Sequence, residues 1–296
     1  MTDADWQTLF ATVPYQWLKA REESMGRAFS DDEFKKFLQS PATIAKMGEW
    51  EETLAGMKQA DMTALGNRVL EWLPAEANIH ARVFPEIKPR TNSFVWHKDK
   101  EDPAIFLYLE KETKAQFENT VAHECHHIGL GSLDTVQEKM VAELPPNVKK
   151  ATEWLGAFGE GEAMLAAAGS PDLHPHWEDD GVKRARWDSD MTHFNTDLAA
   201  VQQMEMDILD GKLKTDEEIR KVADPFWGYQ GAWYTVGYEM AALVEKQYGR
   251  KVFDECLMDP RKLLVKYNEI AKKANADGAQ MAVWSDELLK RLQAKS

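Results

Sequence analysis

The sequence predicts a mostly helical α+β protein that contains one small sheet. Most of the chain repeats apolar residues at helical spacing. Three short segments interrupt this pattern with β-branched and aromatic residues, and they lie at 79–87, 93–97 and 104–109. The third segment runs almost directly into a helical segment that reads His-Glu-x-x-His. We therefore expect the sheet to lie beside that helix.

We expect the chain to form a single unit with three parts. Residues 1–78 should be a helical amino-terminal part, 79–170 should hold the sheet and the metal-binding helices, and 171–296 should be a helical carboxy-terminal lobe. In this last part the spacing of apolar residues predicts one long helix from Val182 to Leu209 and another between Gly231 and Gly249.

Local signals predict where the His-Glu-x-x-His helix begins and ends. Thr113 and Gln116 have the spacing of a capping box, and Gly129 and Gly131 follow where a helix C-cap is expected. At about 100° per residue, one narrow stripe of apolar side chains should face the core; it consists of Phe117, Val121, Cys125 and Ile128. The stripe makes Cys125 a buried thiol and leaves the histidines on another side.

The residues His123, Glu124 and His127 have the spacing of a zinc site. Residues four apart on a helix are about one turn apart, roughly 6 Å along the axis, so both imidazoles leave the same face. They can bind one Zn²⁺, with Glu124 within reach of a water at the metal. His126 is an alternative second ligand, because it lies three residues after His123 and could share a helix face with it.

A third protein ligand is expected from a later helix, because two histidines leave a tetrahedral zinc ion one ligand short while water takes the open position. The segment Phe158 to Ala163 contains two candidates, Glu160 and Glu162. They differ by about 200° around a helix, so only one of them can face the metal.

The sequence from Thr120 to Gly129, together with Glu160-Gly161-x-Ala163, resembles the gluzincin group of zinc peptidases. More narrowly, it is similar to uncharacterised families of zinc-dependent peptidases, as is the later segment from Tyr234 to Tyr238. The likeness covers about residues 105–270. It implies a two-lobed, zincin-like architecture, one zinc ion per chain and Glu160 as the third ligand. Its cleft would run between the sheet with its metal helix and the carboxy-terminal helices.

The sequence departs from the gluzincin pattern in two ways. The gap from His127 to Glu160 is 33 residues (160 − 127), which is longer than in the best-known members. Met164 stands one turn after the ligand, where an acidic partner of a metal-binding histidine is often found. The sequence therefore does not identify an acidic partner for the metal-binding histidines.

Two tyrosines are candidates for stabilising an oxyanion. Tyr234 and Tyr238 stand four residues apart on one flank of a predicted helix. A tyrosine hydroxyl aimed at the developing oxyanion is common in zinc peptidase sites, and Tyr234 is the first candidate. Tyrosines at this spacing also commonly pack in a core.

Composition and charge exclude several classes of partner. The formal charge of −14 and the pI near 5.1 argue against nucleic acid and anionic membranes. The amino terminus lacks the features of a signal peptide, and two cysteines give no disulfide framework. We expect a cytoplasmic protein, although a chain trimmed of a leader would read the same way.

The expected activity is hydrolysis of peptide bonds in a peptide or protein substrate, with Glu124 as the general base. Two alternatives remain open: hydrolysis of a non-peptide amide at the same zinc site, and a non-catalytic binding or scaffold protein with a structural or vestigial metal. Outside the zinc motif, His174 and His176 lie in a proline-broken segment that predicts a solvated loop or, as the alternative, an accessory metal or substrate contact.

Overall fold

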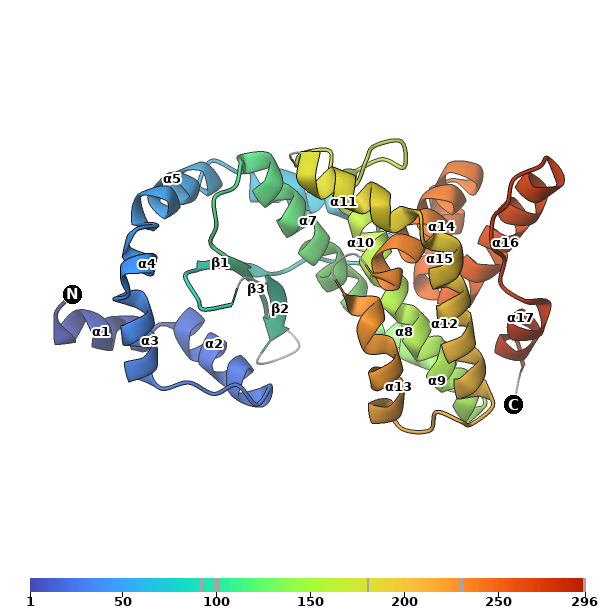
Figure 1. Cartoon of the computed structure of the whole chain (residues 1–296), viewed down its shortest axis with the longest axis horizontal. Coiled ribbons are helices and arrows are strands. Elements are labelled where there is room, and N and C mark those ends of the chain that lie inside the picture. Colours follow the sequence, from blue (N-terminus) through green and yellow to red (C-terminus); the bar gives the residue numbers. More distant parts are fainter. Residues whose placement is uncertain (91–92, 98–101, 180, 229–230, 295–296) are drawn as a thin grey trace. The chain divides into compact units, whose positions relative to one another are not determined.

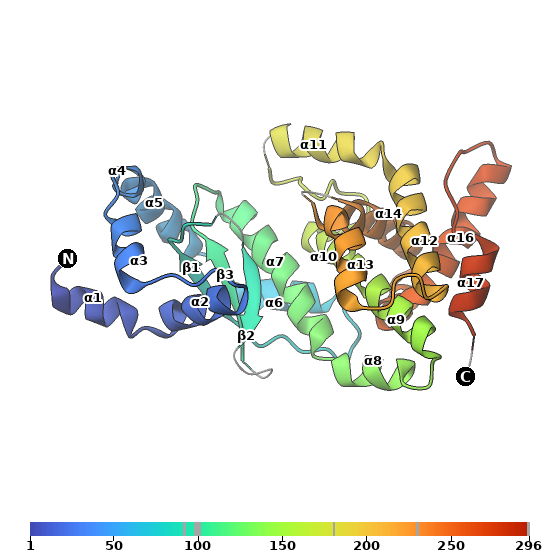
Figure 2. The same cartoon turned by 60° about the horizontal axis from the view of Figure 1, so that its bottom comes forward.

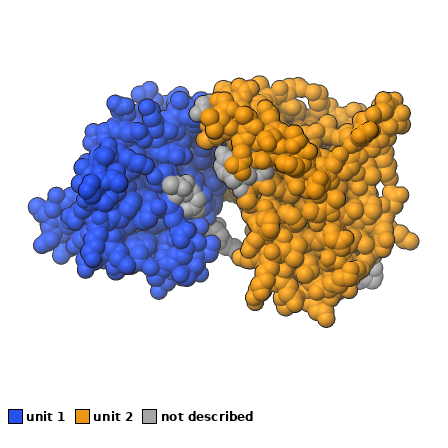
Figure 3. Space-filling model, viewed as in Figure 1, with its two compact units in different colours: residues 1–61, 80–124 blue, residues 62–79, 125–296 orange. Residues whose placement is uncertain are grey.

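The computed structural model describes residues 1–90, 93–97, 102–179, 181–228 and 231–294. The chain divides into two compact units (Figure 3). Unit 1 consists of Met1–Asp61 and His80–Glu124, and unit 2 consists of Met62–Ile79 and Cys125–Ser296. The described residues are mostly helical and form one small sheet (Figure 1), which confirms the predicted α+β class.

Unit 1 begins with a series of helices that precede the sheet. Ser30 caps the third of them, since its hydroxyl accepts from the backbone N–H of Glu33 at 3.2 Å while the Glu33 carboxylate accepts from that of Ser30 at 2.7 Å. The helices are α1 (Asp3–Phe10), α2 (Val13–Ser24), α3 (Asp31–Leu38), α4 (Pro41–Ile44) and α5 (Met47–Met57).

The sheet has the order β1-β3-β2, with β3 in the centre. Strand β1 pairs with β3 in parallel, and β2 pairs with β3 antiparallel. The strands agree with the three segments predicted from sequence; they are β1 (Arg82–Glu86), β2 (Phe94–His97) and β3 (Pro103–Tyr108).

Both faces of the central strand are buried. On one face, the Phe106 ring stacks on Phe94 with ring centroids 5.1 Å apart, and it packs with Tyr15 and Phe34 from α2 and α3. Ile105 points to the opposite face, as the alternation of side chains along a strand requires, and it is also fully buried. The sheet is therefore part of the core of unit 1.

Unit 2 consists of helices (Figure 2). Helix α7 (Lys114–Gly131) passes from unit 1 into it without a break. The other helices are α6 (Met62–Leu70), α8 (Asp134–Val141), α9 (Pro146–Leu155), η1 (Gly156–Phe158), α10 (Gly159–Ala168), α11 (Gly181–Met191), α12 (Phe194–Leu209), α13 (Asp216–Ala223), η2 (Asp224–Trp227), α14 (Ala232–Tyr248), α15 (Arg250–Met258), α16 (Pro260–Ala276) and α17 (Asp286–Leu292).

Helix α14 lies at the centre of unit 2. It contacts α10, α12, α15 and α16, and its buried side chains recur at helical spacing. The indole N–H of the buried Trp284 lies 3.3 Å from the sulfur of Met240 on α14, and the Trp284 backbone is held by two hydrogen bonds to the Asn268 amide. The predicted helix between Gly231 and Gly249 is confirmed.

The single long helix predicted from Val182 to Leu209 is wrong. The chain turns at Thr192 and His193, between α11 and α12. The Thr192 hydroxyl donates to the carbonyl of Ser189 at 2.6 Å, and the backbone N–H groups of both turn residues bond three residues back. This local hydrogen bonding competes with the helical ladder and ends α11.

Among the residues that the structure describes, no helix has both the length and the apolar character needed to cross a membrane.

A buried carboxyl group in the core of unit 2 should make folding sensitive to pH. Glu205 on α12 is fully buried, and neither of its carboxyl oxygens has a hydrogen-bond partner among the described residues. Burial raises the pKa of Glu205 well above its ordinary value. The folded protein therefore binds this proton more tightly than the unfolded chain does, so folding stability falls as pH rises above the ordinary glutamate pKa.

We predict that Glu205→Gln weakens this pH dependence. Wild type should lose about 1.4 kcal/mol of unfolding free energy per pH unit from this one group above pH ~5, and the variant should not. Urea unfolding at pH 5 and pH 8 measures the difference. Glu217→Gln is the matched control, because Glu217 is exposed and pairs with Lys221 on the surface. Equal pH slopes in wild type and Glu205→Gln would contradict the prediction.

Candidate metal centre

Helix α7 forms as the sequence predicts. The Thr113 hydroxyl accepts from the backbone N–H of Gln116 at 3.2 Å, and the Gln116 side chain accepts from that of Thr113 at 2.8 Å. Gly131 is the last residue of the helix, and Gly129 lies inside it. A side chain does not fit at Gly129, since a Cβ there would lie 2.3 Å from the Leu73 side chain. The predicted core stripe is buried at all four positions, which are Phe117, Val121, Cys125 and Ile128.

The side chains of His123, His127 and Glu160 come together. Each offers one ligand atom, and these atoms all lie within 4.8 Å of one another. His127 Nε2 lies 3.5 Å from Glu160 Oε2. This separation is close to the edge of a tetrahedron with zinc–ligand bonds of about 2.1 Å, roughly 3.4 Å. Two imidazoles and one carboxylate form a donor set that suits Zn²⁺ with one open position.

His127 and Glu160 are both partly buried. The His127 and Glu160 side chains are 29% and 17% exposed, so a ligand can reach them although most of each side chain is packed. His123 lies on the preceding turn of α7, and the helix itself therefore sets its spacing from His127.

A close helix crossing positions Glu160. Gly161, the next residue on α10, lies against Gly237 on α14, and Figures 1 and 2 show these helices side by side. A Cβ at Gly161 would lie 2.0 Å from the backbone nitrogen of Tyr238 and 2.4 Å from the Gly237 carbonyl carbon. Only glycine lets the two backbones approach this closely.

Glu162 lies on another side of α10. It is 4% exposed and is not part of the ligand group. Burial raises the pKa of Glu162 to about 8, and the nearby His127 opposes this rise. The two carboxyl groups therefore occupy different environments, as their spacing of about 200° around the helix predicts.

The other residues of the motif differ in burial. Glu124 is half-buried and follows His123 directly on α7. His126 is fully buried, its ring centroid lies 6.3 Å from that of His127, and it is not part of the ligand group.

The two candidate tyrosines lie on α14. The Tyr238 hydroxyl donates to the carbonyl of Leu173 at 2.9 Å, and its ring packs edge-on against Trp187. Burial raises the pKa of Tyr238 to about 12. Tyr234, one turn earlier, is half-buried against the core of unit 2. The catalytic role expected for Tyr234 stays a prediction.

A second group of ligand-type side chains includes residues that the sequence did not single out. His176, Glu178 and Asp179 also bring their ligand atoms within 4.8 Å of one another. Asp179 is paired with His176 Nδ1 and with the ammonium of Lys183, each at 3.0 Å. Because Lys183 already supplies a positive charge, this group does not require a metal ion.

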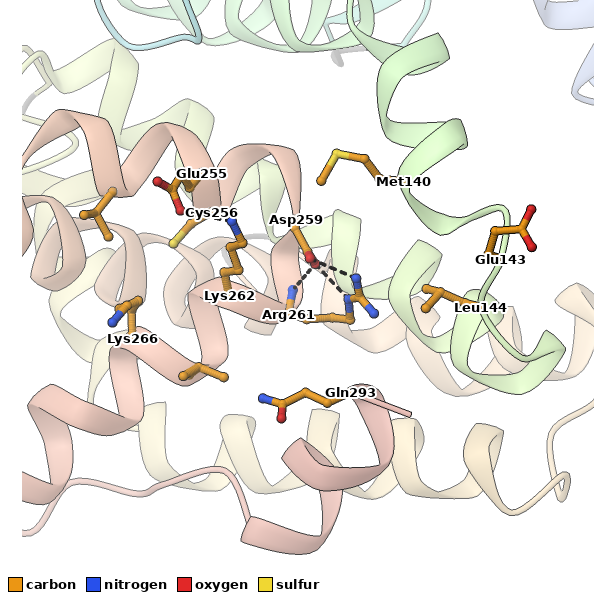
Figure 4. A pocket seen from close by; sticks show the side chains of 12 residues that line it. Met140, Glu143, Leu144, Glu255, Cys256, Asp259, Arg261, Lys262, Lys266 and Gln293 are labelled. Carbon is orange, nitrogen blue, oxygen red and sulfur yellow. Dashed lines mark hydrogen bonds and ion pairs between the residues drawn. The ribbon is translucent and has the colours of Figure 1, made fainter. Parts of the chain in front are cut away.

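Unit 2 also contains a cavity of about 810 Å³ between α8, α15 and α16 (Figure 4). Its charges are paired within the protein: the Arg261 guanidinium donates two hydrogen bonds to the Asp259 carboxylate, and Lys262 pairs with Glu255 at 3.0 Å. Burial raises the pKa of Cys256 to about 12, so this thiol is not a nucleophile.

Comparison with known proteins identifies a family for the chain. A family model described as "Putative zinc dependent peptidase (DUF5700)" matches residues 6–276, which is most of the chain. No curated protein and no solved structure matches the chain.

We predict that zinc binding depends on Glu160 and not on Glu162. Protein purified without added metal should contain about one zinc ion per chain by mass spectrometry. His127→Ala and Glu160→Gln should lose that zinc because each removes a ligand, and Glu162→Gln should keep it. His193→Ala changes an exposed histidine and serves as the control. If Glu160→Gln retained zinc and Glu162→Gln lost it, the prediction would be wrong and Glu162 would be the third ligand.

We also predict that Gly161→Ala disturbs both folding and metal binding. The added methyl group collides with the backbone of α14, which should cost about 3 kcal/mol of unfolding free energy and displace Glu160. Thermal unfolding and zinc affinity measure the two effects. Gly66→Ala is the matched control, because this glycine on α6 has no atom within 4 Å of its Cβ position and alanine favours a helix. A Gly161→Ala variant as stable as Gly66→Ala would contradict the close contact.

Proposed function

We propose that this chain, which belongs to the family described as "Putative zinc dependent peptidase (DUF5700)" over residues 6–276, is a metallopeptidase that hydrolyses peptide bonds. The convergence of His123, His127 and Glu160, with Glu124 next to the first of them, supports this proposal most directly. A site with a purely structural metal would have no need for Glu124.

The proposed mechanism assigns a proton transfer to Glu124. Zinc held by the two histidines and Glu160 would polarise the substrate carbonyl and lower the pKa of the attacking water toward about 7. The Glu124 carboxylate takes the proton from that water as it attacks the carbonyl carbon. The same group then gives the proton to the leaving amine, so that the carboxylate is restored when the C–N bond breaks.

The Tyr234 hydroxyl is proposed to donate a hydrogen bond to the oxyanion that forms on the substrate. Tyr238 is less suited to this role, because its hydroxyl already donates to the Leu173 carbonyl. The half-buried position of Tyr234, one turn before the crossing with α10, supports this order of preference.

We propose a peptide or protein as the substrate and no nucleic acid or membrane as a partner. The net charge of −14 supports this choice, since phosphate backbones and anionic lipids repel an acidic protein. The reducing environment of the cytoplasm suits a chain whose two cysteines are both buried thiols.

We predict that Glu124→Gln keeps zinc but lowers the rate of peptide hydrolysis by about 10²–10⁴-fold, because the amide cannot accept the proton from water. The measurements are cleavage of a peptide library followed by mass spectrometry, and zinc content of the same samples. Glu118→Gln on the same helix is the matched control, since this residue pairs with Lys114.

The outcomes separate the remaining alternatives. Full activity in Glu124→Gln would rule out this mechanism. If the protein bound zinc and hydrolysed a non-peptide amide but cleaved no peptide, the substrate would be a non-peptide amide instead of a peptide. Zinc binding without hydrolysis of either kind of amide would favour a binding or scaffold protein.

A further inference from the structure

Unit 1 contains a small cavity that is lined by basic side chains. Its volume is about 190 Å³, and it lies where the segment after α2 meets the segment after β1. Arg27 belongs to the first segment, and Lys88 and Arg90 belong to the second. Because the chain as a whole carries a charge of −14, this group of cations is a local departure from its acidic character.

Three guanidinium groups gather at one carboxylate beside this cavity. The Glu22 carboxylate is buried and accepts two hydrogen bonds from Arg27, at 2.8 and 3.1 Å. It also accepts one from its neighbour Arg21. The Arg90 guanidinium lies 3.7 Å from the same carboxylate, which is beyond hydrogen-bonding distance. A single carboxylate balances the charge of only one of these three groups.

Lys88 adds a further positive charge. Its side chain is buried, and its ammonium donates to the neutral carbonyl of Arg90 at 2.9 Å. Burial lowers the pKa of Lys88 to about 8, which leaves the ammonium mostly charged at pH 7. Glu86 opposes this shift, but burial raises the pKa of Glu86 to about 8, so that carboxyl group is mostly neutral at pH 7.

Glu33 is the second carboxylate that lines the cavity. It is exposed, and it accepts hydrogen bonds from the backbone N–H and the hydroxyl of Ser30, each at 2.7 Å. Among the residues that the structure describes at this cavity, two carboxylates therefore face four cations, an excess of two positive charges. The carboxylates are Glu22 and Glu33, and the cations are Arg21, Arg27, Lys88 and Arg90.

The two arginines that line the cavity can offer hydrogen bonds to a ligand. A guanidinium has five N–H donors, and Arg27 uses two of them on Glu22. The Arg27 and Arg90 side chains are 29% and 58% exposed, so a solute can reach both. Guanidinium groups bind the oxygens of phosphates and carboxylates through paired hydrogen bonds.

The size of the cavity limits the ligand to a small molecule. Cavities that enclose drug-sized ligands span about 300–1,000 Å³, and this one is smaller. Its volume suits one oxyanion with a few attached atoms and not a nucleotide. The half-buried Phe29 and the exposed Pro89 also line it and give the attached atoms an apolar surface.

We propose that this cavity binds a dianionic phosphate group, as inorganic phosphate or as a small phosphate monoester, between Arg27 and Arg90. A phosphate group carries about −1.5 to −2 charges at pH 7 and so matches the excess of two positive charges, whereas a carboxylate brings only one. The bound ion would hold the segment after β1 to the end of α2. This site is independent of the proposed peptidase function.

The test measures binding by isothermal titration calorimetry with three probes at equal pH and ionic strength, which are inorganic phosphate, phenyl phosphate and acetate. Wild type should bind both phosphates about tenfold more tightly than acetate, because a dianion gains about twice the Coulomb energy of a monoanion. Tighter binding of phenyl phosphate than of inorganic phosphate would support a monoester as the occupant. Equal binding of the two would support inorganic phosphate.

Arg90→Gln should weaken phosphate binding about tenfold, because it removes charge-assisted hydrogen bonds. Arg27→Gln should act in the same direction, but it also takes two hydrogen bonds from the buried Glu22 and can impair folding. The exposed Arg90 is therefore the deciding position. Arg68→Gln is the matched control, because it removes the same charge from an exposed residue of α6 that does not line the cavity.

Several results would overturn the proposal. These are no phosphate binding by wild type, equal affinity for acetate and phosphate, and an Arg90→Gln affinity equal to that of Arg68→Gln. His127→Ala lacks a proposed zinc ligand and should bind phosphate as wild type does. Loss of phosphate binding in His127→Ala, with full binding in Arg90→Gln, would place the ion at the metal centre and overturn the proposal as well.

Discussion

The contact between Gly161 and Gly237 is the constraint on which the candidate site depends. It presses the short helix α10 against α14, the central helix of unit 2. Glu160 precedes this contact by one residue, so its carboxylate is held by packed backbone on an ordered helix rather than by a loop. Ligands carried on rigid elements keep their geometry when the metal leaves. The histidine pair has the same advantage, because both residues lie on the single helix α7.

The parts of the fold that depend on neighbours in sequence could be predicted. Helix α7 has the capping box that was predicted from Thr113 and Gln116. The spacing of His123 and His127 is also a local signal, and both residues lie on this helix as predicted. The three strands were also evident from composition and turns. Their order could not be read in the same way, because pairing β1 with β3 involves residues about twenty positions apart.

The rest of the site depends on tertiary packing. Sequence reasoning limited the third ligand to Glu160 or Glu162, but the side of α10 that faces the histidines is set by the crossing with α14. The turn at Thr192 was missed because a side-chain hydrogen bond overrides an apolar pattern that continues through it.

The burial of Cys125, which lies between the two histidines in the sequence, has a consequence for the proposed zinc ion. Its sulfur faces the core, and the donor set consists of nitrogen and oxygen only. Oxidants that strip zinc from thiolate sites therefore have no ligand to attack here. Protons compete instead, since an imidazole must be neutral to bind a metal. Occupancy should follow the acidity of the compartment and be indifferent to its redox state.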